Sequence, residues 1–440
     1  MVIKRPGSGG GEAAAPVLIQ GHIDMVTESN EPFDFENKAI ELVRDGDYIT
    51  ANGTTLGADN GIGVAAALAL LQMPRSAKLP PLECLFTVDE ETGLTGAKQL
   101  NGEMLSAKTM LNLDTEEWGS VYVGCAGGGD SVITVPATHE TLTGEHGDFE
   151  AFSLKISGLK GGHSGIDIAS GRSNAVRLAA VVIMEAVSLF GAENVLVVDI
   201  KGGNKRNAIA RECTATICVR SDSETKLREL CAEKSRQFSR EFGSVETGLK
   251  LELSPDSNIP SEALTATSTR ALLCLLTSLP HGVIRMSPVI GDLVETSSNM
   301  AAICYDEKEK VYTLTCSTRS SVASALENVR LQIKMLAEMC GGTVSQPEAY
   351  PGWQPNLESK IVKVTSACYE SLTSEKPKLL AIHAGLECGL INDRCGITET
   401  VSFGPTIHGA HSPDEKVEIA TVAPFFELVV AVLGELADAR

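Results

Sequence analysis

The sequence predicts an α/β protein, with a mixed, mostly parallel sheet and flanking helices, that is interrupted by an inserted α+β domain. Two observations lead to this fold class. Several short apolar runs end in acids or histidines, which is where open α/β sheets place their ligands. Two of these polar exits, at Asp114 and His411, are so far apart in the chain that a second domain has to lie between them if they share one site.

Length and composition limit the class of protein. With 440 residues, 43% of them apolar, the chain can bury a large core and is expected to form two domains. Its formal net charge of −20 argues against nucleic acid or an anionic membrane as partner, because phosphate would be repelled. The 12 cysteines include no CxxC pair, so we expect reduced thiols and a cytoplasmic location. Neither a signal peptide nor an uninterrupted apolar run of membrane-spanning length is expected.

The first apolar run, Val17–Gln20, predicts a buried strand that ends in His22 and Asp24. Because residues two apart on a strand point the same way, the Asp24 carboxylate could hold the His22 ring while that ring binds a metal. The same spacing is also common in strands that bind nothing.

The next polar group is Asp59, which lies between glycines just before Ile62–Leu71, a run expected to form a buried helix. A carboxylate at the start of a buried helix is costly unless a cation contacts it, and no Lys or Arg occurs between Arg44 and Arg75. A metal ion is therefore the simplest partner. The alternative is that Asp59 or Asn60 only caps the helix.

A second predicted strand, Leu82–Val88, runs directly into Asp89, Glu90 and Glu91. Three adjacent acids repel one another, so they either form a solvated loop or are stabilised by cations and a role in proton transfer.

Two further apolar runs have the same arrangement. Met110–Leu113 ends in Asp114, and Thr400–Phe403 leads into a polar stretch that contains His411. Together with the polar residues that follow the two earlier strands, they predict one site where these side chains converge, rather than a set of separate solvated loops.

The interval between Asp114 and His411 is expected to hold the inserted domain. The α/β domain is assigned residues 1–126 and 351–440, and the inserted domain residues 127–350. Strands and one amphipathic helix are predicted there at Phe152–Ile156, Val195–Ile200, Cys213–Val219, Met300–Cys304, Val311–Cys316 and Asn174–Phe190. Arg220 and Arg319 close comparable strands, which suggests an internal duplication.

Two stretches of the inserted domain are more polar than folding requires. Gly161–Gly165 places His163 between glycines, and Gly202–Ala208 places Arg206 and Asn207 after a strand. These groups either form solvated turns or clamp a substrate.

Near the end of the chain, Leu379–Ile382 leads into His383 and Cys388. This pair allows an alternative chemistry, a thiol nucleophile activated by an imidazole. The final stretch, Val422–Leu436, predicts an amphipathic helix that covers the sheet.

Ten motifs occur in one order along the chain: GHIDMV, GTTLGADNGIG, DEETGLTGA, LNLDTEE, GCAGG, LKGGHSG, RNAIARE, AYPGWQP, IHAGLECG and GAHSPDE. With them the chain resembles the aminoacyl-histidine dipeptidases, of the aminoacylase and carboxypeptidase group of co-catalytic zinc peptidases. The resemblance implies a catalytic α/β domain interrupted by a lid domain. It also implies hydrolysis of small Xaa-His dipeptides, including β-alanyl-histidine. The implied cofactors are two divalent ions, with Zn²⁺ expected and Mn²⁺ or Co²⁺ as alternatives, and a homodimer is compatible with the family.

Residue roles follow from the same resemblance, by matching motif. His22, Asp59 and Asp114 would hold one metal, and Asp59, Glu91 and His411 would hold the other. Glu90 would be the general base that takes a proton from a water bridging the two metals, which leaves a metal-bound hydroxide as the nucleophile, and Asp24 would orient His22. Three residues of the lid would bind the substrate: His163, Asn207 and Arg319.

One departure from the family concerns the N-terminus. The family has a helix and a strand upstream of GHIDMV, whereas only Met1–Pro6 and a glycine-rich turn precede it here. We therefore expect the start of the catalytic domain to be truncated, at a cost in stability. Two alternatives for function stay open: an N-acyl-amino-acid amidohydrolase, and an inactive relative that serves as a binding or assembly module.

Overall fold

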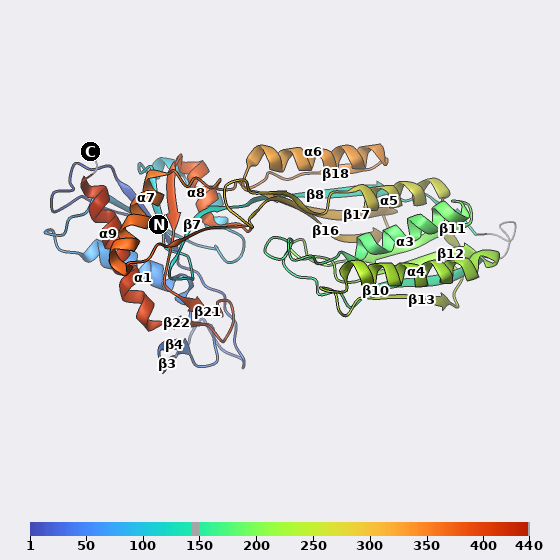
Figure 1. The fold of residues 1–440 in the computed structure, drawn as a ribbon, viewed down its shortest axis with the longest axis horizontal. Helices are drawn as coiled ribbons and strands as arrows, with labels where there is room; N and C mark the ends of the chain where they lie inside the picture. Colours follow the sequence, from blue (N-terminus) through green and yellow to red (C-terminus); the bar gives the residue numbers. More distant parts are fainter. Residues whose placement is uncertain (143–148, 439–440) are drawn as a thin grey trace. The chain divides into compact units, whose positions relative to one another are not determined.

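The computed structural model describes residues 1–142 and 149–438, and the chain divides into two compact units (Figure 1). The first unit contains Met1–Ala126, Pro288–Gly291 and Pro351–Arg440, and the second contains Gly127–Ser287 and Asp292–Tyr350. The first is an α/β domain and the second an α+β domain inserted into it, which confirms the predicted fold class.

The first unit is built on a sheet of seven strands. In order across the sheet they are β1 (Val2–Arg5), β5 (Leu82–Thr87), β2 (Val17–His22), β6 (Thr109–Asn112), β20 (Glu399–Ser402), β7 (Ser120–Cys125) and β19 (Lys378–Ile382). The four strands β5, β2, β6 and β20 are parallel to one another, while β1 and β7 run antiparallel to their neighbours β5 and β20. The carboxyl ends of the four parallel strands therefore meet at one edge of the sheet.

Three helices pack on one face of this sheet: α1 (Ala58–Gln72), α7 (Lys360–Thr373) and α9 (Ile419–Asp438). Leu70 of α1, Ile361 of α7 and Phe425 of α9 are buried in one cluster with Ile19 and Phe86 of the strands. Alternate residues of a fully buried strand face opposite sides, so the same strands also present side chains to α8 (Glu387–Cys395).

The run Ile62–Leu71 forms a helix as expected, but only one side of this helix is buried. Ala66, Ala67 and Leu70 face the core, but Leu68 is 42% exposed and Ala65 is exposed beside it. The run is apolar on every side, so its pattern could not distinguish the core face from the outer face.

Helix α9 covers the sheet over a slightly longer range than the predicted Val422–Leu436. Within the described chain it is also the one helix long and apolar enough to cross a membrane, judged by length and composition alone. Phe425, Val429 and Leu433 on this helix are buried in the core of the first unit. Core helices of globular domains commonly have this character.

The first unit also has short elements around its sheet. A small antiparallel sheet has the order β21 (Ile407–His408), β22 (Lys416–Glu418), β4 (Tyr48–Ala51) and β3 (Leu42–Asp45). Two short helical segments, α2 (Thr95–Lys98) and η1 (Gly102–Met104), follow β5. The loop between β21 and β22 carries His411. Glu415 in the same loop accepts hydrogen bonds from the N–H groups of Leu56 and Gly57, so this loop lies against the segment that precedes α1.

The second unit is built on a nine-stranded antiparallel sheet. Its strands are β8 (Gly127–Pro136), β10 (Phe149–Ser157), β11 (Val195–Gly202), β12 (Cys213–Arg220), β13 (Lys250–Asp256), β15 (Gly282–Met286), β16 (Val294–Asp306), β17 (Val311–Ser320) and β18 (Thr343–Ser345). The other elements are β9 (His139–Thr141) paired with β14 (Glu262–Leu264), the 3₁₀ turn η3 (Ser221–Ser223), and the helices α3 (Ala175–Phe190), α4 (Glu224–Phe242), α5 (Ala266–Ser278) and α6 (Ala323–Met339).

The order of strands in this sheet supports the suggested duplication. From one edge the strands are β13, β10, β12 and β11, followed by β16, β17, β8 and β18. Each half has the same sequence of parts, because β10, α3, β11, β12, α4 and β13 correspond to β8, α5, β16, β17, α6 and β18. Arg220 and Arg319 then lie at equivalent strand ends, but Arg220 is exposed and Arg319 is buried.

Candidate metal centre

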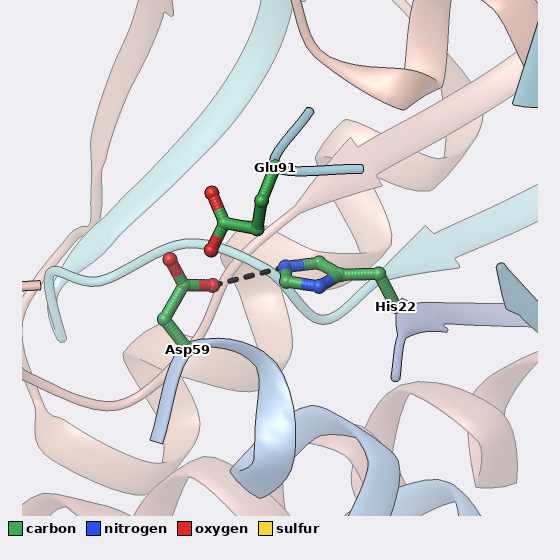
Figure 2. Close-up of side chains that lie close together, drawn as sticks. All are labelled: His22, Asp59 and Glu91. Carbon is green, nitrogen blue, oxygen red and sulfur yellow. Dashed lines mark hydrogen bonds and ion pairs between the residues drawn. The ribbon is translucent and has the colours of Figure 1, made fainter. Parts of the chain in front are cut away.

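The polar residues at the carboxyl edge of the seven-stranded sheet lie close together. His22 is the last residue of β2, Asp114 follows β6, and Glu91 follows β5. Asp59 is placed beside them by the start of α1, a helix that packs against β2. Ligand atoms of His22, Asp59 and Glu91 all lie within 4.8 Å of one another, and Figure 2 shows the Asp59 carboxylate facing the His22 ring.

Asp59 lies between two imidazoles. Its Oδ1 is 3.1 Å from Nε2 of His22, and its Oδ2 is 3.1 Å from Nε2 of His411. Each histidine has a second carboxylate neighbour: Asp114 Oδ1 is 3.3 Å from His22 Nε2, and Glu91 Oε2 is 3.0 Å from His411 Nε2. The five side chains therefore form two groups of three that share Asp59.

The residue before α1 and the first turn of this helix have an unusual backbone. Gly57 has φ of 75°, and a Cβ there would lie 2.8 Å from the sulfur of Met25. Asp59 and Asn60 have non-helical dihedral angles, and the peptide bond between them is cis. The Asn60 side chain donates a 2.7 Å hydrogen bond to the carbonyl of Leu113, which ties this segment to the end of β6.

Asp24 contacts His22 differently from the expected carboxylate contact. Nδ1 of His22 lies 2.9 Å from the main-chain oxygen of Asp24, and the nearest carboxylate oxygen is farther away, at 3.6 Å. The Asp24 carboxylate instead accepts a 3.2 Å hydrogen bond from the N–H of Glu91. Asp24 therefore orients the ring through its main chain and holds the Glu91 loop through its side chain.

The carboxylates control the charge of both histidines. Burial opposes protonation of His22, but the neighbouring Asp114 and Asp59 outweigh it and raise the pKa of His22 to about 12. Contacts with Asp59 and Glu91 raise the pKa of His411 to about 10. Although burial favours the neutral form of Asp59, the two imidazoles hold its pKa well below the usual range. Without metal, both rings are therefore cationic at neutral pH.

Two other acids of the cluster are shifted in the opposite direction. Burial, with repulsion from Asp114, raises the pKa of Glu90 to about 8. Burial also raises the pKa of Asp114 to about 7, despite the attraction of His22. A carboxyl group that titrates near neutral pH suits a residue that exchanges protons during a reaction.

The donor set fits divalent cations. Oδ1 of Asp24 and Oε1 of Glu91 are buried without a hydrogen-bond partner in the described chain. Within residues 1–142 and 149–438, neither Lys nor Arg pairs with Asp59, Glu91 or Asp114, so only two imidazoles balance these acids. Imidazole nitrogens with carboxylate oxygens are the ligands of catalytic zinc and of related transition metals.

In the second unit, Arg319 and His163 lie together, with Asn207 next to them, whereas Arg206 pairs with Asp130 instead. Arg319 is 8% exposed, and its guanidinium lies 3.5 Å from Nε2 of His163 and 3.4 Å from the hydroxyl of Tyr350. Asn207 is adjacent, since its main-chain carbonyl accepts a 2.8 Å hydrogen bond from the N–H of Ser164, the residue after His163. The Arg319 Nε has no hydrogen-bond partner among the described residues, and none of their carboxylates pairs with this guanidinium. A buried guanidinium without a carboxylate partner is suited to an anionic ligand.

The alternative of a thiol nucleophile does not fit the structure. Cys388 is fully buried in α8, and burial raises its thiol pKa well above the ordinary value. A thiol in such surroundings stays protonated and unreactive. All 12 cysteines are free, as the composition predicted.

Two acids near the site were given no role from the sequence. Glu387 is 1% exposed and accepts 2.6 Å hydrogen bonds from Gln20 and Thr87. Glu415 is 2% exposed and accepts main-chain hydrogen bonds from the segment that carries Asp59. Glu387 lies in the motif IHAGLECG and Glu415 in GAHSPDE. Neither their spacing nor their residue type indicates which distant groups of the chain they contact.

Fold and cluster together define a hydrolase of the metallopeptidase class. Residues 18–435 match peptidase family M20/M25/M40, and the chain belongs to that family. It is 37% identical over 439 residues to the cytosol non-specific dipeptidase of Escherichia coli (strain K12), covering 99% of this chain and 88% of the relative.

Solved structures agree with this membership. The aminoacylhistidine dipeptidase from Vibrio alginolyticus superposes with a TM-score of 0.90 at 38% identity, over 98% of this chain and 86% of that chain. The aminopeptidase PepT from Bacillus cereus shares the fold, with a TM-score of 0.52 at 16% identity over 99% of this chain and 84% of that chain. The resemblance stated from the ten motifs is therefore confirmed.

Proposed function

We propose that this chain is a dipeptidase that hydrolyses Xaa-His dipeptides, including β-alanyl-histidine, with two divalent metal ions. The names of the relatives from E. coli and V. alginolyticus support a dipeptide substrate, and the latter supports a C-terminal histidine. The cytosolic relative and the 12 free cysteines support a cytoplasmic location.

One observation carries the proposal: Asp59 directs one carboxylate oxygen to His22 and the other to His411. A carboxylate that serves two neighbouring groups in this way is what a pair of metal ions requires of its bridging ligand. We assign His22, Asp59 and Asp114 to one ion, and Asp59, Glu91 and His411 to the other. Zn²⁺ is the proposed metal, with Mn²⁺ and Co²⁺ as alternatives that the same ligands would accept.

When bound, such ions would lower the pKa of a water molecule and polarise the scissile carbonyl. Glu90 is the proposed general base. It follows β5 next to Glu91 and is half-buried, so its carboxyl group lies beside the proposed ligands. Glu90 would take a proton from the attacking water and deliver it to the nitrogen of the departing amino acid as the peptide bond breaks.

The inserted domain is proposed to act as a lid that binds the substrate. Arg319 offers a buried guanidinium that has no carboxylate partner in the described chain, which suits the C-terminal carboxylate of a dipeptide. Burial lowers the pKa of His163, and the positive charge of nearby Arg319 lowers it further. His163 is thus kept neutral, and it and Asn207 would complete the polar contacts to the peptide.

A substrate panel tests this function. Purified protein loaded with Zn²⁺ or Mn²⁺ is incubated with β-alanyl-histidine, other Xaa-His dipeptides, dipeptides without histidine, and N-acetylated amino acids. We expect hydrolysis of the dipeptides, with Xaa-His among the substrates. Preference for the acetylated amino acids would favour the amidohydrolase alternative. If metal-loaded protein hydrolysed neither class, the inactive binding module would be favoured.

A further inference from the structure

Glu415 is the acceptor for four consecutive main-chain N–H groups. Its Oε2 accepts hydrogen bonds of 2.7 and 2.9 Å from Leu56 and Gly57, and its Oε1 accepts bonds of 2.8 and 3.2 Å from Ala58 and Asp59. The side chain is 2% exposed. One carboxylate therefore satisfies the donors of the whole segment that ends at Asp59.

The same residue is fixed to the loop that carries His411. The N–H of Glu415 donates a 3.0 Å hydrogen bond to the carbonyl of Ser412, which closes a turn directly after His411. Its own carbonyl accepts a 2.7 Å hydrogen bond from the hydroxyl of Thr50 on β4. Glu415 thus connects the segment that carries Asp59 to the loop that carries His411. Asp59 and His411 are 352 positions apart in the chain.

Charge is what makes this contact strong. The free N–H groups at the start of a helix form its positive end, and hydrogen bonds from N–H groups to an ionised carboxylate are about twice as strong as those between neutral groups. A glutamine at this position would keep the shape but lose the charge. Its amide nitrogen would also point donor hydrogens at N–H groups that need an acceptor.

We propose that Glu415 is a positioning residue for the metal centre, which holds the Asp59 carboxylate at the place where it can serve both His22 and His411. This inference rests on the proposed function, because it assumes that Asp59 is shared by two metal ions. Glu415 itself contacts no proposed ligand side chain and would act only through the main chain of Asp59 and the turn after His411.

Glu83 provides a matched control in the same unit. It is 3% exposed, and its Oε2 accepts hydrogen bonds from the main-chain N–H groups of Ser106 and Ala107 at 2.8 and 3.0 Å. It lies at the start of β5, whereas Glu90 follows the other end of that strand. Loss of either carboxylate removes main-chain caps, but only Glu415 caps the segment that carries Asp59.

The experiment compares Glu415→Gln and Glu83→Gln with the wild type as full-length proteins. Metal affinity is measured by competition with a chelator, and the visible spectrum of Co²⁺-loaded protein reports ligand geometry. We expect Glu415→Gln to weaken metal binding by about 10–100-fold, the usual effect of removing a group that orients a ligand, and to alter the Co²⁺ spectrum. Glu83→Gln should lower the unfolding midpoint while keeping wild-type affinity and spectrum.

The outcomes separate this inference from the proposed function. If Glu415→Gln binds metal like the wild type with an unchanged Co²⁺ spectrum, Glu415 is only a structural cap and the inference fails alone. Equal weakening in both variants would likewise overturn it. If the wild type binds no pair of ions, both proposals fail. Should Glu415→Gln not fold, Glu415→Asp takes its place, because it keeps the charge but cannot reach all four N–H groups, and the same weakening is expected.

Discussion

The Oδ2 atom of Asp59 lies 3.1 Å from Nε2 of His411, although 352 positions separate these residues in the chain. The other oxygen of Asp59 contacts His22 at the same distance. The contact with His411 depends on the inserted domain returning the chain to the first unit, where β20 joins the sheet beside β6. The metal binding and the hydrolysis proposed for the protein depend on this shared carboxylate.

Glu90→Gln should abolish most hydrolysis while metal binding persists. The change removes the proposed proton acceptor but no proposed ligand, and losing one general base costs about 10²–10⁴-fold in rate. Metal content and dipeptide turnover are measured on the same samples. Asp89→Asn is the control, because Asp89 is the adjacent acid, is exposed, and has no proposed role. Normal turnover by metal-loaded Glu90→Gln would remove Glu90 from the mechanism.

Arg319→Met should mainly impair substrates that have a free C-terminal carboxylate. A guanidinium can bind a carboxylate through two parallel hydrogen bonds, and a C-terminal amide cannot replace them. The test compares kcat/KM for a dipeptide and its amidated form. Arg220→Met, at the equivalent end of β12, is the matched control and should change neither value. A similar loss for both substrates would assign Arg319 a structural role instead.

Metal binding should release protons and strengthen as pH rises. With pKa values of about 12 and about 10, His22 and His411 are protonated in the metal-free protein at pH 7, whereas a metal ligand must be neutral. Each imidazole therefore loses one proton on binding. Affinity rises steeply with pH up to about 10, where His411 becomes neutral, and less steeply up to about 12, where His22 does. Calorimetry in buffers of different ionisation enthalpy counts these protons. An affinity that does not vary with pH, without proton release, would show that neither imidazole is a ligand.

The buried His281 provides an internal comparison for that measurement. Burial, assisted by Arg177, lowers its pKa to about 4, so it is neutral at pH 7 in the metal-free protein. His281→Gln should therefore leave the number of released protons unchanged.

Gly57→Ala should lower both stability and metal affinity. A non-glycine residue in the left-handed region costs about 1–2 kcal/mol, and the new Cβ would also press on Met25 beside the Asp59 segment. Gly53→Ala is the matched control, because Gly53 has φ of 73° with open space around it. Denaturant unfolding should show a loss in both variants, whereas chelator competition should show weaker binding in Gly57→Ala alone. Equal metal affinity in the two variants would contradict a role for the Gly57 conformation in placing Asp59.

Much of the fold could be predicted from the sequence, because the information is local. The buried strands β2, β5, β6 and β20 are apolar runs that each end in polar residues, so their positions and the polar edge follow from the pattern. The apolar run also predicts the helix at Ile62–Leu71, but not which side of it is exposed, since alanine and leucine on every face give no periodic signal.

The contacts between the residues of the candidate site could not be predicted from the sequence in the same way. Sequence order suggests that Asp59 and His411 converge, but their 3.1 Å approach depends on register and loop geometry across the whole first unit. Asp24 illustrates the limit, because its spacing from His22 predicted a carboxylate contact and the main-chain oxygen makes it instead. Glu415 gives no signal at all, since its partners are main-chain N–H groups that any residue type would supply.

The most direct test of the account is the metal content of wild-type protein and of Asp59→Asn, measured by elemental analysis after saturation with Zn²⁺ and removal of excess metal. Because Asp59 is proposed to serve both ions, we predict two zinc ions per wild-type chain and loss of both, together with dipeptide hydrolysis, in Asp59→Asn. Asp130→Asn is the control, because Asp130 pairs with Arg206 in the inserted domain, and it should retain both ions. An Asp59→Asn protein that still holds two zinc ions and hydrolyses dipeptides like the wild type would contradict the proposed metal centre.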